Sequence, residues 1–243
     1  MRRRFFVDRF EQGRAVLRGD AAHHAFRVLR ATAGQEFELS DGQAVWLARI
    51  TAARRDAVEF SLLEPVPVAA PAVEMALLLA IVKFDRFEWA LEKATELGVA
   101  QITPLAAARS EKALVAAAAK RAARWQKVLT EAAQQSRQLR APVLQPATRP
   151  ADAFRAAAGA HRGDVLLFFS EYPGAPALRT VVQNRTARSA VVAIGPEGGW
   201  TPEERDAALA AGFCEAGLGP TILRTETAVA AALACVTYAL ARE

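Results

Sequence analysis

Short apolar runs alternate with helix-like segments from residue 75 to residue 240. The apolar runs occupy residues 75–82, 101–105, 165–169, 191–194 and 214–218, and the helix-like segments occupy residues 84–97, 111–140, 202–211 and 225–240. Such runs are typical of strands buried on both faces, and their alternation with helices favours a parallel sheet covered on both sides. The pattern therefore predicts an α/β domain. Because threaded chains are rare, ordinary topology would make its sheet open and doubly wound.

The N-terminal part of the chain has a different pattern, which predicts a β-rich module. Residues 36–40 and 44–50 flank Asp41-Gly42, a dipeptide that favours a tight hairpin turn. Residues 57–62 predict a third strand. Together these strands favour a small barrel or a curled sheet.

A proline-rich segment separates the two patterns. Residues 64–71 contain three prolines, which disfavour helix interiors and central strands. The predicted domains are therefore residues 1–70 and residues 71–243. Within the first domain, residues 23–30 predict a short helix with a basic face.

Basic residues gather in two regions of a chain whose formal net charge is +5. Residues 1–30 contain eight arginines and three acidic residues, and residues 109–140 contain eight Lys or Arg and two acidic residues. Clustered Lys and Arg bind polyanions by releasing counterions from phosphates, which favours a nucleic-acid partner. The alternative is a solvated basic surface.

Several classes of protein are excluded by what the sequence lacks. No apolar run approaches the roughly 20 residues that span a bilayer, and the N-terminal residues lack the apolar region of a secretion signal. The predicted location is cytoplasmic. Cys214 and Cys235 are the only cysteines and lack metal-ligand spacing, so we expect two small buried side chains and no metal site.

Two glycine-containing segments each follow an apolar run and lead into a helix-like stretch. They are residues 194–199, Ile-Gly-Pro-Glu-Gly-Gly, and residues 218–228, Leu-Gly-Pro-Thr-Ile-Leu-Arg-Thr-Glu-Thr-Ala. Glycine lets the backbone approach a ligand closely, and loops at strand ends are where α/β sheets bind small molecules. Neither segment has the dinucleotide fingerprint or the phosphate-loop motif. We therefore predict a nucleotide-like ligand that is held in another way.

This pair of segments closely resembles the signature of the RsmE family, methyltransferases of the knotted SPOUT superfamily that act on N3 of a uridine in 16S ribosomal RNA. Other residues resemble family landmarks in the family order, namely His23, residues 27–30, Asp41-Gly42, Lys83, residues 92–99 and residues 102–104. The resemblance covers nearly the whole chain, and the two C-terminal segments are specific as a pair.

The resemblance implies an architecture and a set of partners. Residues 1–70 would form a PUA-like RNA-binding domain, and residues 71–243 a SPOUT domain with a trefoil knot and a parallel sheet. The implied cofactor is S-adenosylmethionine, and the implied partner is 16S ribosomal RNA in the small ribosomal subunit. The resemblance also implies a homodimer, because SPOUT sites form where two knotted domains meet. Composition and periodicity indicate neither the knot nor the dimer.

The resemblance further places the cofactor on three loops. The first follows an apolar run, is matched by position alone, and supplies Phe169, Ser170 and Glu171. The signature segments supply Gly195, Pro196, Glu197, Gly198 and Gly199, and then Leu218, Gly219, Ile222, Leu223, Arg224, Thr225, Thr227 and Ala228.

Some residues in these loops also fit a structural role. Thr225 and Thr227 have the right chemistry to cap the final helix. Thr201 with Glu204 three positions later predicts a capping box at the start of another helix. Trp200 either lines the pocket or packs beside it.

Methylation of uridine N3 requires that its proton is removed and that the negative charge on the ring is stabilised. Arg224 is the predicted cation, because its planar set of donors fits a uracil carbonyl or a phosphate. The alternative is that Arg224 forms an ion pair with Glu197 or Glu226. Glu197 is the predicted base, with Glu226 and water as the alternatives.

Nine residues are predicted to contact RNA. They are Arg9, Arg27 and Arg30 in the N-terminal region, and Lys83, Arg86, Lys93, Arg109, Gln134 and Arg137 at positions similar to those of the family. The alternative for each is a solvated surface position.

Two other functions remain open at this point. One is a SPOUT methyltransferase that acts on transfer RNA or on a 2′-hydroxyl, and the other is a non-catalytic RNA-binding or assembly factor. The intact glycines of the first signature segment and the unbroken residues 223–227 argue against the second of these.

Overall fold

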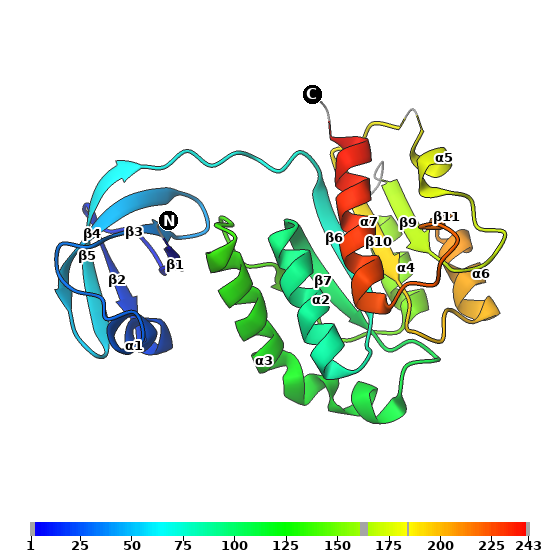
Figure 1. Ribbon diagram of the computed structural model, residues 1–243, viewed down its shortest axis with the longest axis horizontal. Coiled ribbons are helices and arrows are strands. Elements are labelled where there is room, and N and C mark those ends of the chain that lie inside the picture. The colour runs from blue at the N-terminus through cyan, green and yellow to red at the C-terminus, as the bar shows by residue number, and fades with distance from the viewer. Residues whose placement is uncertain (1–2, 161–164, 184, 242–243) are drawn as a thin grey trace. The chain divides into compact units, whose positions relative to one another are not determined.

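The computed structural model describes residues 3–160, 165–183 and 185–241, and it divides the chain into two compact units (Figure 1). The first unit comprises residues 1–70 and 130–141, and the second comprises residues 71–129 and 142–243. Each unit has a hydrophobic core of its own. The division after Ala70 falls within the proline-rich segment, whereas nothing in that segment signals that residues 130–141 belong to the first unit.

The first unit is a curled sheet of five strands with one short helix. Its strands are β1 (Arg4–Phe6), β2 (Arg14–Arg18), β3 (Glu36–Ser40), β4 (Val45–Ala53) and β5 (Ala57–Pro65), in the order β1-β3-β4-β5-β2. β1 runs parallel to β3 and the other pairs are antiparallel. Phe5, Leu17, Leu39 and Phe60 are fully buried in its core. The predicted hairpin and third strand are confirmed, and β1 and β2 are additional.

Helix α1 (Gly19–Arg27) begins and ends earlier than residues 23–30, so the predicted bounds are wrong. Arg30 has φ of +51°, and the Ala31 N–H donates to the carbonyl of Ala25, six residues earlier. A left-handed residue commonly follows the last turn of a helix and ends it. Arg30 therefore lies beyond the helix, while Arg27 is its last residue.

The end of helix α3 (Lys112–Gln135) and the turn after it belong to the first unit. The buried guanidinium of Arg4 pairs with Glu38 and donates to the carbonyls of Arg137 and Gln138. The Ser40 hydroxyl donates to the carbonyl of Leu139. These donors satisfy carbonyls of the turn that follows the helix, whose backbone groups have no helical partner. The predicted helix over residues 111–140 is confirmed but ends earlier.

The second unit contains a parallel sheet of six strands. They are β6 (Glu74–Ala80), β7 (Val99–Leu105), β8 (Val143–Leu144), β9 (Val165–Phe169), β10 (Ser189–Ile194) and β11 (Cys214–Ala216), in the order β11-β9-β10-β6-β7-β8. Every pair of neighbours in this sheet is parallel. The predicted parallel α/β fold is confirmed, whereas the threading of a trefoil knot stays a prediction.

Helices cover both faces of this sheet (Figure 1). The helices are α2 (Phe84–Glu96), the first part of α3, α4 (Pro150–Ala160), α5 (Leu178–Val182), α6 (Pro202–Ala210) and α7 (Thr225–Leu240). Alternate residues of β6 show the two faces, since Leu77 packs in the core formed with α2 and α7, and Leu78 packs in the core formed with α4 and α6. Burial on both faces explains why the strands read as continuous apolar runs.

Some features of the second unit differ from the sequence expectations. β8, α4 and α5 were not predicted. β8 has two residues and α5 has five, whereas α4 buries residues 150, 153, 154 and 157, a helical spacing that the sequence analysis missed. Cys235 is exposed and Cys214 is half-buried, so the expectation of two buried cysteines is wrong. Among the helices that the structure describes, none is both long enough and apolar enough to cross a membrane.

Candidate active site

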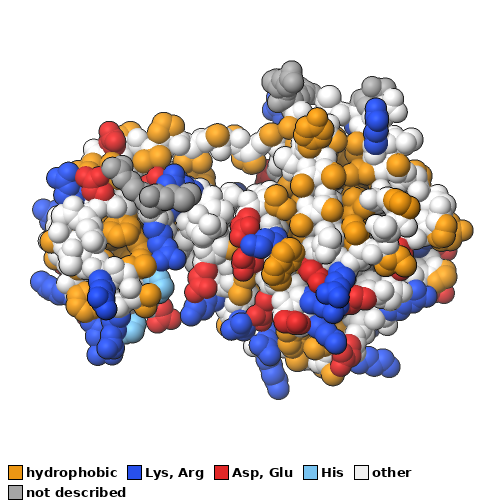
Figure 2. Space-filling view, in the orientation of Figure 1, with side chains coloured by type: hydrophobic (Ala, Val, Ile, Leu, Met, Phe, Trp, Pro, Cys, Tyr) orange, Lys and Arg blue, Asp and Glu red, His pale blue; other side chains and the backbone are white. Residues whose placement is uncertain are grey.

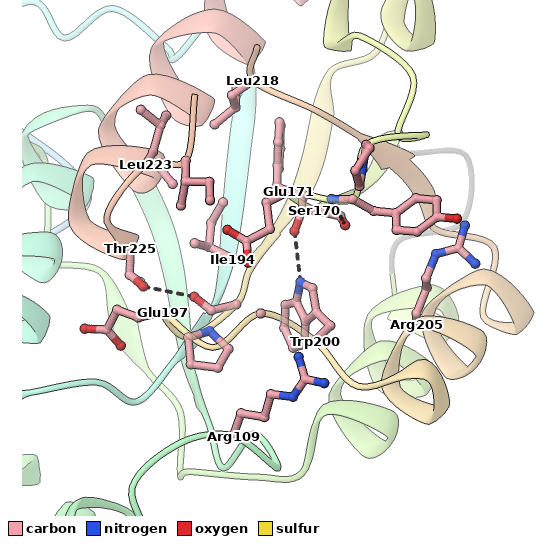
Figure 3. A pocket seen from close by; sticks show the side chains of 18 of the residues that line it. Arg109, Ser170, Glu171, Ile194, Glu197, Trp200, Arg205, Leu218, Leu223 and Thr225 are labelled. Atoms are coloured by element: carbon pink, nitrogen blue, oxygen red, sulfur yellow. Dashed lines mark hydrogen bonds between the residues drawn. The ribbon is translucent and has the colours of Figure 1, made fainter. Parts of the chain in front are cut away.

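Three loops that are far apart in the sequence form one cavity of about 670 Å³ (Figure 3). They follow β9, β10 and β11, which are neighbours in the parallel sheet, so their carboxyl ends lie at the same edge. This edge is where α/β sheets generally bind ligands. The geometry thus brings the two signature segments and the position-matched loop together.

Most of the predicted cofactor-binding residues line this cavity. Those on its wall are Phe169, Ser170, Glu171, Gly195, Pro196, Glu197, Gly199, Leu218, Gly219, Ile222, Leu223, Thr225 and Ala228. Gly198, Arg224 and Thr227 are not on the wall. The wall also includes residues that we did not assign to the cofactor, namely Arg109, Tyr172, Pro173, Ile194, Trp200, Thr201, Pro202, Arg205, Asp206, Pro220 and Thr221.

The glycines of the first signature segment are explained by their neighbours. A Cβ atom at Gly195 would lie 2.9 Å from the ring of Trp200, and one at Gly198 would lie 3.3 Å from the Cβ atom of Arg109. Gly199 has φ of +71°, a conformation that side-chain-bearing residues rarely adopt. Gly198 therefore contributes by making room for Arg109, although it does not face the ligand cavity.

Trp200 both lines the cavity and packs beneath it, so both readings of this residue hold. Its indole Nε1 donates to the carbonyl of Phe169 at 2.9 Å. Its ring lies 5.0 Å from the ring of Phe168 and 5.9 Å from that of Phe154, measured between centroids. Trp200 thus ties the loop after β10 to the end of β9.

Thr225 ties the third loop to the second. Its hydroxyl donates to the carbonyl of Gly195 at 3.2 Å (Figure 3). Arg224 is the N-cap residue of α7 and no side chain caps that helix end. The expectation that Thr225 or Thr227 caps the helix is therefore wrong, and the Thr225 hydroxyl donates to Gly195 instead.

The predicted capping box of Thr201 and Glu204 is confirmed, and Glu204 has a further role. One carboxylate oxygen of Glu204 accepts the N–H of Thr201 at 3.0 Å. The other accepts the N–H of Ala108 at 2.8 Å, from the loop that carries Arg109. The buried Glu204 thus joins a loop after β7 to the start of α6. Sequence spacing indicated the first bond and carried no signal for the second.

Arg205 and Tyr172 form one side wall. Arg205 makes a two-pronged ion pair with the buried carboxylate of Glu215, and its guanidinium lies 5.4 Å from the ring centre of Tyr172. The hydrogen bonds to Glu215 raise the pKa of the Arg205 guanidinium above its ordinary value. The positive charge of Arg205 is therefore matched within the fold.

The predicted catalytic residues have different surroundings. Arg224 is exposed, and it forms neither of the alternative ion pairs among the described residues. Instead Arg86 pairs with Glu197, with Nη1 and Oε1 3.0 Å apart, and approaches Glu226 at 4.0 Å. Glu197 lines the cavity, whereas one oxygen of Glu226 is buried without a hydrogen-bond partner. Of the two carboxylates, Glu197 is the accessible one.

The predicted RNA-contacting residues fall into three groups. Arg27, Arg30 and Lys83 are exposed, and Figure 2 shows Lys and Arg side chains gathered around α1 on the visible face of the first unit. Arg9, Arg86, Lys93 and Arg137 each have a carboxylate close by. The hydrogen bonds that the Lys93 ammonium donates to Glu92 and Glu96 raise the pKa of Lys93. Gln134 is half-buried in the part of α3 that belongs to the first unit, and Arg109 lies at the cavity.

No metal is indicated at this site. Among the described residues, no three His, Cys, Asp or Glu side chains are placed to hold a metal ion. The side chains on the cavity wall combine apolar surfaces with isolated charges. Such a mixture suits an organic ligand that carries charged groups.

Comparison with known proteins identifies the family. A family model for an RNA methyltransferase domain matches residues 69–237, and one for an RNA methyltransferase PUA domain matches residues 17–63. Ribosomal RNA small subunit methyltransferase E from Synechocystis sp. is 34% identical over 221 residues, which are 87% of this chain and 69% of that protein. The Mycobacterium bovis protein of the same name is 34% identical over 230 residues, which are 91% of this chain and 85% of that protein.

Solved structures agree with these matches. The crystal structure of ribosomal RNA small subunit methyltransferase E from Neisseria gonorrhoeae, bound to S-adenosyl methionine, has a TM-score of 0.87 and 29% identity, and the match covers 99% of this chain and 98% of that one. A putative methyltransferase from Legionella pneumophila, in complex with the same cofactor, has a TM-score of 0.85 and 26% identity, with full coverage of both chains. The chain therefore belongs to the ribosomal RNA small subunit methyltransferase E family.

Proposed function

We propose that this protein methylates N3 of a uridine in small-subunit ribosomal RNA, with S-adenosylmethionine as the methyl donor. The observation that carries the proposal is the meeting of three loops at one cavity, in a chain that belongs to this family. The relatives are named as methyltransferases of the small-subunit RNA, and two solved neighbours hold the proposed cofactor. The choice of uridine N3 rests on the resemblance of the signature segments.

The residues present fit the proposed cofactor. Ligand cavities commonly measure about 300–1,000 Å³, and this one, at about 670 Å³, is large enough for an adenosine with an amino-acid tail. Phe169, Ile194, Leu218, Leu223 and Ala228 offer apolar wall for an aromatic base. Glu171 and Arg109 offer charges of both signs for the polar groups. When bound, S-adenosylmethionine supplies a methyl group activated by its positively charged sulfur.

Glu197 is the proposed acceptor of the uridine N3 proton. Its carboxylate lines the cavity and its side chain is 40% exposed, so a substrate can reach it. The ion pair with Arg86 fixes the position of this carboxylate. The Glu226 side chain is only 14% exposed and is not on the cavity wall, which makes it the weaker candidate.

Arg224 is the proposed stabiliser of the negative charge that develops on the uracil ring. It is exposed at the start of α7, next to the wall residues Leu223 and Thr225. No carboxylate among the described residues holds its guanidinium, so its donors are available to a uracil oxygen. Arg27 and Arg30, on the first unit, are proposed to bind RNA phosphates.

We also propose that the protein acts as a homodimer, as the family resemblance implies. Exposed apolar side chains on the third loop and on α7 support this proposal. Ile222 is 79% exposed in the third loop, and Tyr238 is 90% exposed on α7. Analytical ultracentrifugation tests this point, because a monomer at micromolar concentration would contradict it, and Tyr238→Glu should weaken any dimer that uses α7.

Methyl transfer from labelled S-adenosylmethionine to small ribosomal subunits that lack their native methylation tests the activity. Mass spectrometry of the nucleosides should show 3-methyluridine at one site. A different methylated nucleoside would favour another RNA target, such as a 2′-hydroxyl. Failure to transfer methyl and to bind the cofactor would favour a non-catalytic RNA-binding protein.

A further inference from the structure

Two arginines lie on the wall of the cavity, and only one of them has its charge matched. Arg205 is held by Glu215. Arg109 donates from Nη1 to the neutral carbonyl of Gly198 at 2.6 Å, and no described carboxylate lies within ion-pair distance of it. The exposed Glu203 senses the charge of Arg109 only at longer range. Arg109 therefore brings an unmatched positive charge and further N–H donors to the cavity.

Contacts with Glu204 and with Gly198 hold Arg109 and its loop in this position. The carboxylate of Glu204 accepts the N–H of the preceding residue, Ala108, and so fixes the loop to the start of α6. The aliphatic part of the Arg109 side chain lies against Gly198, where a Cβ atom would be 3.3 Å from the Cβ and 3.4 Å from the Cδ atom of the arginine. Arg109 is exposed, and these contacts hold its loop and the stem of its side chain at the cavity.

Glu171 lines the same cavity from another loop, the one after β9 (Figure 3). A Cβ atom at Gly199 would lie 3.1 Å from a carboxylate oxygen of Glu171 and 3.8 Å from Nη1 of Arg109. A negative and a positive group thus border the space above one glycine. Among the described residues, Glu171 has no ion-pair partner of its own.

An α-amino acid carries an ammonium and a carboxylate group on the same carbon atom, and these charges complement those of Glu171 and Arg109. We infer that Arg109 and Glu171 bind the amino-acid end of the cofactor above Gly199, with the guanidinium on its carboxylate and the Glu171 carboxylate on its ammonium. This inference rests on the proposed function and moves Arg109 from the RNA-contacting residues to the cofactor site. It also explains the glycine at 199, since a side chain there would fill the space that the amino acid needs.

Three ligands separate the two charges of the amino-acid end. S-adenosylhomocysteine has both groups, decarboxylated S-adenosylmethionine has only the ammonium, and 5′-methylthioadenosine has neither. Isothermal titration calorimetry would give the Kd of each ligand for the full-length protein and for Arg109→Gln and Glu171→Gln. Comparing variant with parent for one ligand at a time cancels differences between the ligands in sulfur charge.

Arg109→Gln should raise the Kd of S-adenosylhomocysteine by about tenfold to 100-fold. It should change the Kd of each of the other two ligands by less than about twofold. Glu171→Gln should weaken both ligands that carry the ammonium and leave 5′-methylthioadenosine unchanged. Arg155→Gln is the matched control, because Arg155 is an exposed arginine on α4, outside the cavity. It should leave all three constants unchanged.

Other results would overturn the inference. An equal loss for all three ligands in Arg109→Gln would show that Arg109 only shapes the loop. Unchanged affinity for S-adenosylhomocysteine, together with weaker and less salt-dependent RNA binding, would make Arg109 a phosphate contact. If the parent protein bound none of the ligands, the proposed function itself would fail. If the parent bound them and the variants did not discriminate, only this inference would fail.

Discussion

The first signature segment, residues 194–199, lies against other side chains along its length. Trp200 covers Gly195, Arg109 covers Gly198, and Glu171 approaches Gly199. The second segment, residues 218–228, is more open, since nothing lies within 4 Å of a Cβ atom built at Gly219, and Ile222 is 79% exposed. Two glycine-containing segments of similar appearance are therefore built differently. The first is a packed wall of the cavity in which we propose that the cofactor binds, and the second presents exposed side chains that are free to contact a substrate or a partner subunit.

The largest expected effect concerns the second segment, residues 218–228, which is the more exposed of the two. Arg224→Ala should reduce the rate of methyl transfer by about 100-fold or more, the scale of losing one transition-state donor. Cofactor affinity should stay within about threefold, because Arg224 is not on the cavity wall. Single-turnover kinetics and calorimetry on the same preparation check both values. An equal loss of cofactor binding would make Arg224 part of the packed wall.

A second prediction tests whether the first segment is fixed by packing. Gly195→Ala places a Cβ atom 2.9 Å from the Trp200 ring, which is itself hydrogen-bonded to Phe169. We expect unfolding free energy to fall by about 1–3 kcal/mol, the usual cost of overpacking, and cofactor affinity to fall by tenfold or more. Chemical denaturation and calorimetry measure the two effects.

The matched variant in the second segment is Gly219→Ala. Gly219 has φ of +124° and open space around it, so the cost there comes from backbone strain alone. Replacing Trp200 by Leu should recover part of the loss in Gly195→Ala and none of the loss in Gly219→Ala. Equal recovery in both would contradict the distinction between a packed segment and an open one.

A third prediction concerns the residue that anchors the packed wall to its neighbours. Glu204→Gln keeps one carbonyl oxygen and replaces the second acceptor by a donor, which leaves the N–H of Thr201 or Ala108 without its partner. For a buried hydrogen bond we expect a loss of about 1–3 kcal/mol in stability. Glu203→Gln, at the exposed neighbouring position, should cost less than about 0.5 kcal/mol.

Glu204 should also act on the cofactor through Arg109. Its substitution should weaken S-adenosylhomocysteine binding in the parent protein and have little further effect when Arg109 is already Gln. A double-mutant cycle measures this coupling. Fully additive losses would show that Glu204 supports the fold without positioning Arg109.

The two hydrogen bonds of Glu204 show which contacts the sequence can predict and which it cannot. The spacing of Thr201 and Glu204 predicts a capping box, because both partners lie within one helical turn. The bond to Ala108 joins residues 96 positions apart and leaves no local pattern. The same limit applies to Arg86, whose contact with Glu197 spans 111 positions. The sequence analysis predicted an RNA contact for Arg86, with a solvated surface position as the alternative, and gave no sign of the ion pair.

Other elements follow the same division between local and distant causes. Apolar runs and the Asp41-Gly42 turn predicted the main strands, because each depends on neighbours in the chain. The two-residue β8 forms because β7 offers it a partner, which only the folded sheet provides. Likewise, the family resemblance predicted the three loops that line the cavity. The place of Arg109 on the wall of that cavity follows only from the folded structure.

The smallest expected effect concerns the hydrogen bond that Thr225 makes between the two signature segments. Thr225→Val removes the donor to the Gly195 carbonyl while keeping the side-chain shape, and Thr225→Ser keeps the donor. We expect Thr225→Val to lower the free energy of unfolding by about 1 kcal/mol and to lower the free energy of cofactor binding by a similar amount. Thr225→Ser should be close to the parent in both. Because the first segment has its own contacts with Trp200 and Arg109, it should keep its place without this bond. Hydrogen exchange should therefore increase in residues 218–224 and stay low in residues 194–199. Equal increases in both would mean that the two segments depend on each other.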